Sequence, residues 1–167
     1  MRELLLAYKE RCQALVAASP DPGSLAGLVP SLRPGALDRS AVAELQSHLP
    51  FPLPDSFVGY LQGPLVESGL EWAEVSIPGN NDLATFASLM VRPSLWRLGL
   101  LQFATGRCGD DVCFDYPSAV GEPAVVEINH DRASPEAWAS PQLIRTFADR
   151  RWPSFTALLE EVCCDEP

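Results

Sequence analysis

The hydrophobic period changes twice along this chain, and that change constrains the fold more than any other feature. Residues 5–16, 38–49 and 54–61 carry apolar side chains at helical spacing, and the proline-rich run 49–54 suits neither a helix nor a strand. From Leu70 the pattern alternates, as is typical of strands, and residues 141–162 return to helical spacing. Helices at both ends and closely spaced strands in the middle favour an α+β fold. We therefore expect a mostly antiparallel or mixed sheet of about four to six strands, covered on one face by helices.

Local signals predict where these elements begin and end. The strands are expected at residues 70–77, 98–104, 111–116 and 124–129. Helix N-caps are expected at Asp38, Asp82 and Ser140. Between two of the strands, Gly109-Asp110 is interpreted as a hairpin turn in which glycine supplies a positive φ and Asp110 bonds the local backbone.

Most of the chain is expected to form one domain. We divide its 167 residues into an N-terminal helix with a Pro/Gly-rich connection (1–36) and a single α+β domain (37–167). A domain of this size buries roughly 70% of the surface that its unfolded chain exposes, so it has enough material for a hydrophobic core.

The chain is acidic, with 22 Asp and Glu against 12 Lys and Arg and a net charge of −10. Residues 55–136 carry most of this excess, with twelve acids and four bases. Such a balance disfavours binding to nucleic acid or to anionic lipid and suits a basic protein partner. No stretch approaches the ~20 apolar residues of a membrane helix. Five cysteines without a secretory signal indicate reduced thiols, and we expect a cytoplasmic protein.

The candidate binding residues lie on the polar sides of the expected strands. They are Trp72, Glu74, Asp111, Asp115 and Glu127. If the strands pair, these side chains form an acidic sheet face with one large aromatic residue. Aromatic residues flanked by charge are enriched at protein contacts, so this face is a predicted partner-binding surface. The alternative interpretation is an ordinary solvated sheet face.

No catalytic motif stands out in the sequence. Cys108 and Cys113 have a spacing at the edge of that of zinc ligand pairs, and His130 with Cys163-Cys164 would complete a site. The plainer interpretation is that cysteines in a strand and an amphipathic helix act as small hydrophobic residues. Nothing in the spacing brings Cys108, His130 and Asp131 together as a nucleophilic site. We expect no catalytic residue, no metal and no cofactor.

Three segments resemble a known family. Leu53-Pro54 with Phe57 looks like an entry helix, Leu101 to Ala104 with Gly109-Asp110 looks like a central strand and turn, and Ser154-Phe155 with Leu158 looks like a closing helix. In this order, and with residues 121–131 suiting the last strand, they resemble the SUKH superfamily over roughly residues 37–163. That superfamily includes fungal cell-wall-assembly regulators and bacterial toxin-immunity proteins.

The resemblance implies an α+β domain that binds proteins and is not an enzyme. Its bacterial members bind and block a cognate toxin, often a nuclease, and an acidic inhibitor suits a basic nuclease. The partner expected from this resemblance is a basic toxin domain. Two alternatives stay open: a regulatory scaffold or adaptor with an endogenous partner, and a small metal- or Cys-dependent hydrolase.

Overall fold

The structure is a computed structural model, and it describes residues 2–25, 29–33, 37–67, 69–72, 75–116 and 121–164. Its helices are α1 (Arg2–Ala18), α2 (Pro22–Leu25), α3 (Arg39–Ser47), α4 (Asp55–Leu61), α5 (Leu83–Met90), α6 (Pro93–Trp96), α7 (Pro141–Ile144) and α8 (Phe155–Cys164). Its strands are β1 (Leu32–Arg33), β2 (Leu65–Val66), β3 (Leu70–Trp72), β4 (Val75–Ile77), β5 (Leu100–Thr105), β6 (Asp111–Asp115), β7 (Ala124–Ile128) and β8 (Ala148–Trp152).

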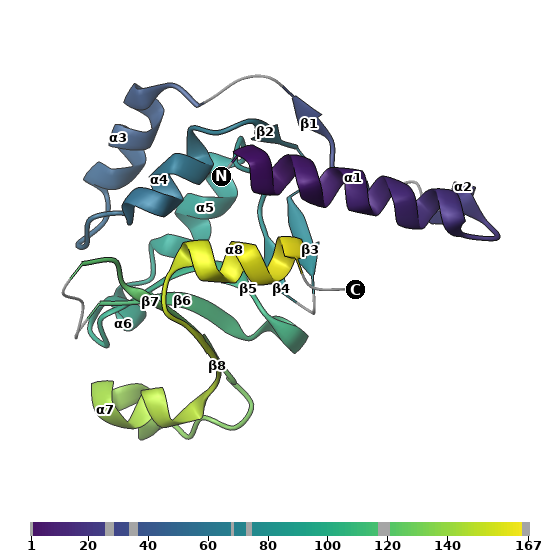
Figure 1. Cartoon of the computed structure of the whole chain (residues 1–167). Coiled ribbons are helices and arrows are strands. Elements are labelled where there is room, and N and C mark those ends of the chain that lie inside the picture. Colours follow the sequence, from purple (N-terminus) through teal and green to yellow (C-terminus); the bar gives the residue numbers. More distant parts are fainter. Residues whose placement is uncertain are drawn as a thin grey trace.

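The predicted α+β class is confirmed. Strands β3 to β8 form a six-stranded sheet in which each strand pairs antiparallel with the next one along the chain. A separate two-stranded sheet joins β1 and β2. Helices α4, α5 and α8 lie on one side of the large sheet, and α7 lies on the other side next to β8 (Figure 1).

The predicted helix caps are confirmed. The Asp38 carboxylate accepts the Ser40 N–H at 3.1 Å before α3, and Asp82 accepts the Thr85 N–H at 3.0 Å before α5. The Ser140 hydroxyl accepts the Leu143 N–H at 3.3 Å, with a proline at the first position of α7. Each side chain satisfies a backbone donor that the first helical turn leaves without a partner.

Two strand predictions are wrong. Residues 70–77 were expected as one strand, but β3 and β4 pair antiparallel with Trp72 opposite Val75. The sequence has no glycine or asparagine there to indicate a tight hairpin, so the alternation of apolar and polar residues predicted one continuous strand. Strand β8 was not expected, because its Asp149, Arg150 and Arg151 hide the alternation. Charged side chains are common on an edge strand, which β8 is.

The main core lies between the sheet and the helices on one face. Phe57 of α4 is its centre, with ring centroids at 5.1 Å from Phe155 and 5.3 Å from Phe114. Phe86 and Phe103 lie at 5.4 and 5.6 Å from the same ring. All five rings are fully buried, so the helices α4, α5 and α8 are fixed on β5 and β6 by one aromatic cluster.

The other face of the sheet is not left bare. A second, smaller apolar cluster covers part of it and is made of Leu95, Leu98, Leu100, Cys113, Val126, Ile128, Ala137 and Ile144. These residues come from β5, β6 and β7 and from the segments around α6 and α7. Side chains of both faces of β6 are therefore buried, and a polar residue on this strand needs an internal partner.

Helix α1 belongs to the main core although it lies outside the segment expected as the domain. Leu5, Tyr8 and Cys12 are buried there, and Arg11 donates to the Val162 carbonyl of α8. The C-terminal half of α1, together with α2, extends past the end of α8 and projects from the molecule (Figure 1). Leu15, in this part of α1, is 46% exposed. None of the described helices is long and apolar enough to cross a membrane.

Replacing Leu5 tests whether α1 is part of the folded unit. Leu5 is fully buried, so Leu5→Ala should lower the free energy of unfolding by about 2–5 kcal/mol. Leu15→Ala is the matched control on the exposed part of the helix and should change it by less than about 0.5 kcal/mol. Urea denaturation measures both values. Equal effects of the two substitutions would show that α1 does not pack as described.

Candidate functional site

The carboxylates predicted to form a binding face are buried. Asp111, Asp115 and Glu127 are 6%, 2% and 4% exposed. Trp72 lies in β3, but its side chain and all of Glu74 are outside the residues that the structure describes. The predicted acidic surface on β6 and β7 is therefore wrong, because alternation identifies the polar side of a strand and not whether other elements cover that side.

The three carboxylates also do not share a face. In the register of β6 and β7, Asp111 pairs with Ile128 and Asp115 pairs with Ala124, whereas Glu127 pairs with Val112. Residues directly opposite one another in an antiparallel pair point to the same face. Glu127 thus lies on the side of the main core, and the two aspartates lie on the side of the second cluster.

Asp115 is the most enclosed of these residues. Its Oδ1 accepts from Arg145 Nε at 2.9 Å and Nη2 at 2.6 Å, and its Oδ2 accepts from Arg151 Nη2 at 3.2 Å. Arg145 also donates to the carbonyls of Leu98 and Pro141. One buried carboxylate therefore joins β6, β8 and the segment after α7, and its function here is structural.

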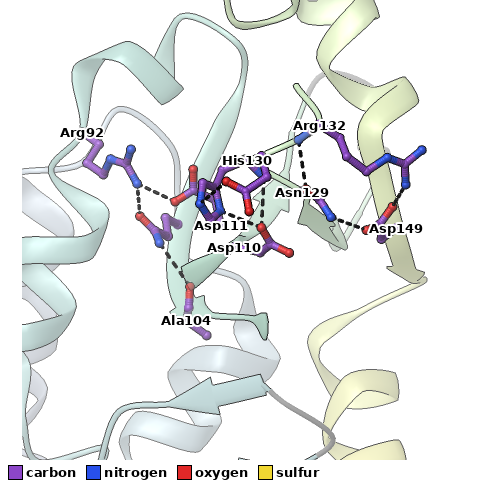
Figure 2. A network of polar contacts seen from close by, with 10 residues as sticks. Arg92, Ala104, Asp110, Asp111, Asn129, His130, Arg132 and Asp149 are labelled. Carbon is purple, nitrogen blue, oxygen red and sulfur yellow. Dashed lines mark hydrogen bonds and ion pairs between the residues drawn. The ribbon is translucent and has the colours of Figure 1, made fainter. Parts of the chain in front are cut away.

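Asp111 takes part in a second polar network (Figure 2). Arg92 Nη1, at the start of α6, donates to Asp111 Oδ1 at 2.6 Å and to Gln102 Oε1 at 2.5 Å. The Gln102 amide then donates to the Ala104 carbonyl, where the register of β5 and β6 shifts. The network satisfies polar groups at this irregularity and anchors α6 to the sheet.

Glu127 lies at the same end of the sheet on the other face. Its Oε2 is 3.5 Å from Arg150 Nε of β8, and its side chain lies against the backbone of Gly106. A Cβ at Gly106 would approach Glu127 Oε1 to 1.9 Å, so only glycine leaves room for the carboxylate there.

The loop after β5 and the end of β7 form a third polar cluster. Asp110 Oδ1 lies 2.7 Å from His130 Nδ1 and accepts the His130 N–H at 3.0 Å (Figure 2). His130 Nε2 is 3.1 Å from Asp131 Oδ1. The predicted positive φ of Gly109 is confirmed at 90°, but Asp110 bonds a backbone group twenty residues away and not the local turn.

This third cluster brings Cys108 and His130 to the same end of the sheet, which the sequence spacing did not indicate. Gly109, next to Cys108, has an ideal Cβ position 4.0 Å from His130 Cε1. Both ring nitrogens of His130 nevertheless face aspartates, so the imidazole is not positioned to take a proton from the thiol. Among the described residues, no group of three or more His, Cys, Asp or Glu is placed to hold a metal ion.

A surface cavity lies elsewhere, between the segment before α4 and the segments flanking β6 and β7. It has a volume of about 430 Å³ and is lined by Pro52, Leu53, Pro54, Asp55, Tyr116, Gly121, Glu122 and Pro123. Its lining mixes apolar and polar surface, and its two acidic residues, Asp55 and Glu122, are exposed. This size lies within the rough range of 300–1,000 Å³ that is usual for small-molecule sites.

Two hydrogen bonds connect the walls of this cavity. The Tyr116 hydroxyl donates to the Pro52 carbonyl at 2.5 Å, and the Ser56 N–H donates to Glu122 Oε1 at 2.7 Å. The Tyr116 ring also stacks on Phe51 with centroids 4.5 Å apart. Burial, with Glu122 adding to it, raises the pKa of Tyr116, so its hydroxyl stays protonated as a donor.

Sequence reasoning missed this cavity because its walls come from segments more than sixty residues apart. The sequence predicts only that the proline-rich run 49–54 suits neither a helix nor a strand.

Comparisons with protein-family models, curated proteins and solved structures found no match for this chain.

Asp115→Asn tests whether the buried carboxylate is structural. Asparagine removes the charge opposite Arg145 and Arg151 and places an amide donor beside a guanidinium, so the free energy of unfolding should fall by about 3–5 kcal/mol. The matched control is Asp149→Asn in the exposed pair with Arg132, for which the expected loss is below about 1 kcal/mol. Urea denaturation measures the free energy of unfolding of both variants. Equal losses in the two variants would contradict a structural role for Asp115.

Alkylation with iodoacetamide tests the environment of two thiols. Cys108 is exposed and should react in the native protein. Burial raises the pKa of the Cys113 thiol, with Asp111 adding to it, so Cys113 should react only after unfolding in urea. Mass spectrometry of the peptides measures both rates, and similar rates in the native protein would contradict the burial of Cys113.

Proposed function

We propose that this chain is a protein-binding domain without catalytic activity whose partner is basic. On its resemblance to the SUKH superfamily, we further propose that it is an immunity protein that binds and blocks a cognate toxin. The distribution of charge is the observation that supports a basic partner.

The net charge of the chain resides outside its buried ionic networks. Four buried carboxylates, Asp110, Asp111, Asp115 and Glu127, are matched in number by the arginines that contact three of them. These arginines are Arg92, Arg145, Arg150 and Arg151. The remaining residues therefore carry the whole net charge of −10.

This surplus lies on much of the exposed surface. The exposed acidic residues include Glu44 on α3, Asp55 on α4, Glu71 on β3 and Glu160 on α8. A negative surface attracts a positively charged domain from a distance and accelerates its encounter. For a nuclease, the same surface would cover the cations that bind phosphate, so binding and inhibition would be one event.

Co-expression tests this function. We expect that the chain suppresses the growth defect caused by a basic toxic domain encoded beside its gene, and that the two purified proteins form a stoichiometric complex. The Kd should rise several-fold from low to physiological salt, because screening weakens attraction between surface charges. An unrelated acidic protein of similar charge, expressed at the same level, is the control for a general polyanion effect.

Continued toxicity with a stably expressed chain would contradict the immunity function. A stoichiometric complex with an endogenous regulator would contradict the immunity function and support a regulatory scaffold instead. A complex whose Kd does not depend on salt would contradict the argument from charge.

A further inference from the structure

We propose that the cavity between Pro52 and Glu122 binds an arginine side chain of the protein partner. The inference rests on the proposed function, because it names the contact that a basic partner would make. The cavity lining mixes apolar and polar surface and includes two acidic residues, Asp55 and Glu122, and its chemistry therefore favours a ligand that is both cationic and partly apolar.

The carboxylates have capacity left for a ligand. An ionised carboxylate offers about four lone-pair sites on its two oxygens, and the Ser56 N–H uses one site of Glu122. Asp55 is exposed at the first turn of α4. A cation that binds Glu122 gains a charge-assisted contact without breaking the hydrogen bond that holds the wall, and the negative charge of Asp55 in the same lining adds to the attraction.

The rest of the lining favours arginine over lysine. Among the lining residues, Pro52 is exposed and Tyr116 is half-buried, so a proline ring and an aromatic ring are available to a ligand. A guanidinium is planar and weakly hydrated, so it packs against such surfaces while it donates to carboxylates in a fork. A lysine ammonium is compact and strongly hydrated and would lose more of its water in the same place.

The cavity is also formed before a ligand arrives. The bonds Tyr116–Pro52 and Ser56–Glu122 hold its walls, and Phe51, which is not a lining residue, supports the Tyr116 ring by stacking. Proline fixes the backbone of both walls further. A preformed site loses little conformational entropy on binding, which is what a single anchoring side chain needs.

The first experiment is an NMR titration of the full chain with N-acetyl-arginine N-methylamide. Saturable shifts with a millimolar Kd are expected for the amides of Leu53, Tyr116 and Gly121. N-acetyl-lysine N-methylamide should bind about threefold more weakly, and N-acetyl-norleucine N-methylamide should cause no saturable shift. Shifts elsewhere with none at the cavity, or equal shifts with norleucine, would overturn the proposal.

A pair of variants tests the carboxylate. In Glu122→Gln the amide oxygen still accepts the Ser56 N–H, so the wall stays in place while the charge is lost. Its Kd for the arginine probe should rise about threefold, as for an exposed ion pair. Glu160→Gln removes an exposed charge on α8 and should leave the Kd unchanged. If both substitutions raised the Kd equally, the probe would be attracted by the general negative charge of the protein, and the proposal would be overturned.

The two proposals fail in different ways. The probe titration needs no partner, so binding of arginine at the cavity supports the site even if co-expression finds no toxin. Where a complex does form, Glu122→Gln should weaken it clearly more than Glu160→Gln, which removes the same charge outside the cavity. A complex that tolerates both substitutions would support the function and overturn the arginine anchor.

Discussion

The packing of Phe57 is the interaction on which the rest of the structure depends. Its ring contacts aromatic rings from α5, β5, β6 and α8, and all of these rings are fully buried. An aromatic side chain contributes a large buried area, and edge-to-face pairs add roughly 0.5–1.5 kcal/mol each. One side chain on a seven-residue helix therefore fixes how the helices lie on the sheet.

This aromatic cluster joins three segments that lie far apart in the sequence. Phe57, Phe103 and Phe155 come from the three segments that resemble the SUKH superfamily, and their rings meet in the core. These three segments of the chain therefore belong to one packing unit. Packing of these three rings in the core explains how the chain folds. It does not bear on whether the chain binds a protein partner.

Local features were predictable from sequence, and relations between distant segments were not. Asp38, Asp82 and Ser140 cap helices as predicted, since a cap depends on residues two or three positions away. The burial of Asp115 depends instead on Arg145 and Arg151, which come thirty and thirty-six residues later. Alternation along a strand distinguishes the two faces of the sheet. It cannot show that the second apolar cluster covers the face predicted to be polar and exposed. The cavity was missed for the same reason, because Pro52 and Glu122 are neighbours only in the fold.

The buried networks also change how the charge of the chain is interpreted. A buried carboxylate needs a cationic or hydrogen-bonded partner, and four of the twelve basic residues serve that purpose for Asp111, Asp115 and Glu127. These arginines are held by internal carboxylates, which limits how far they neutralise acids elsewhere on the surface. The four arginines are matched in number by the four buried carboxylates, so these ion pairs stabilise the sheet without changing the net charge. The charge of −10 that supports a basic partner therefore belongs to the acidic residues outside these pairs.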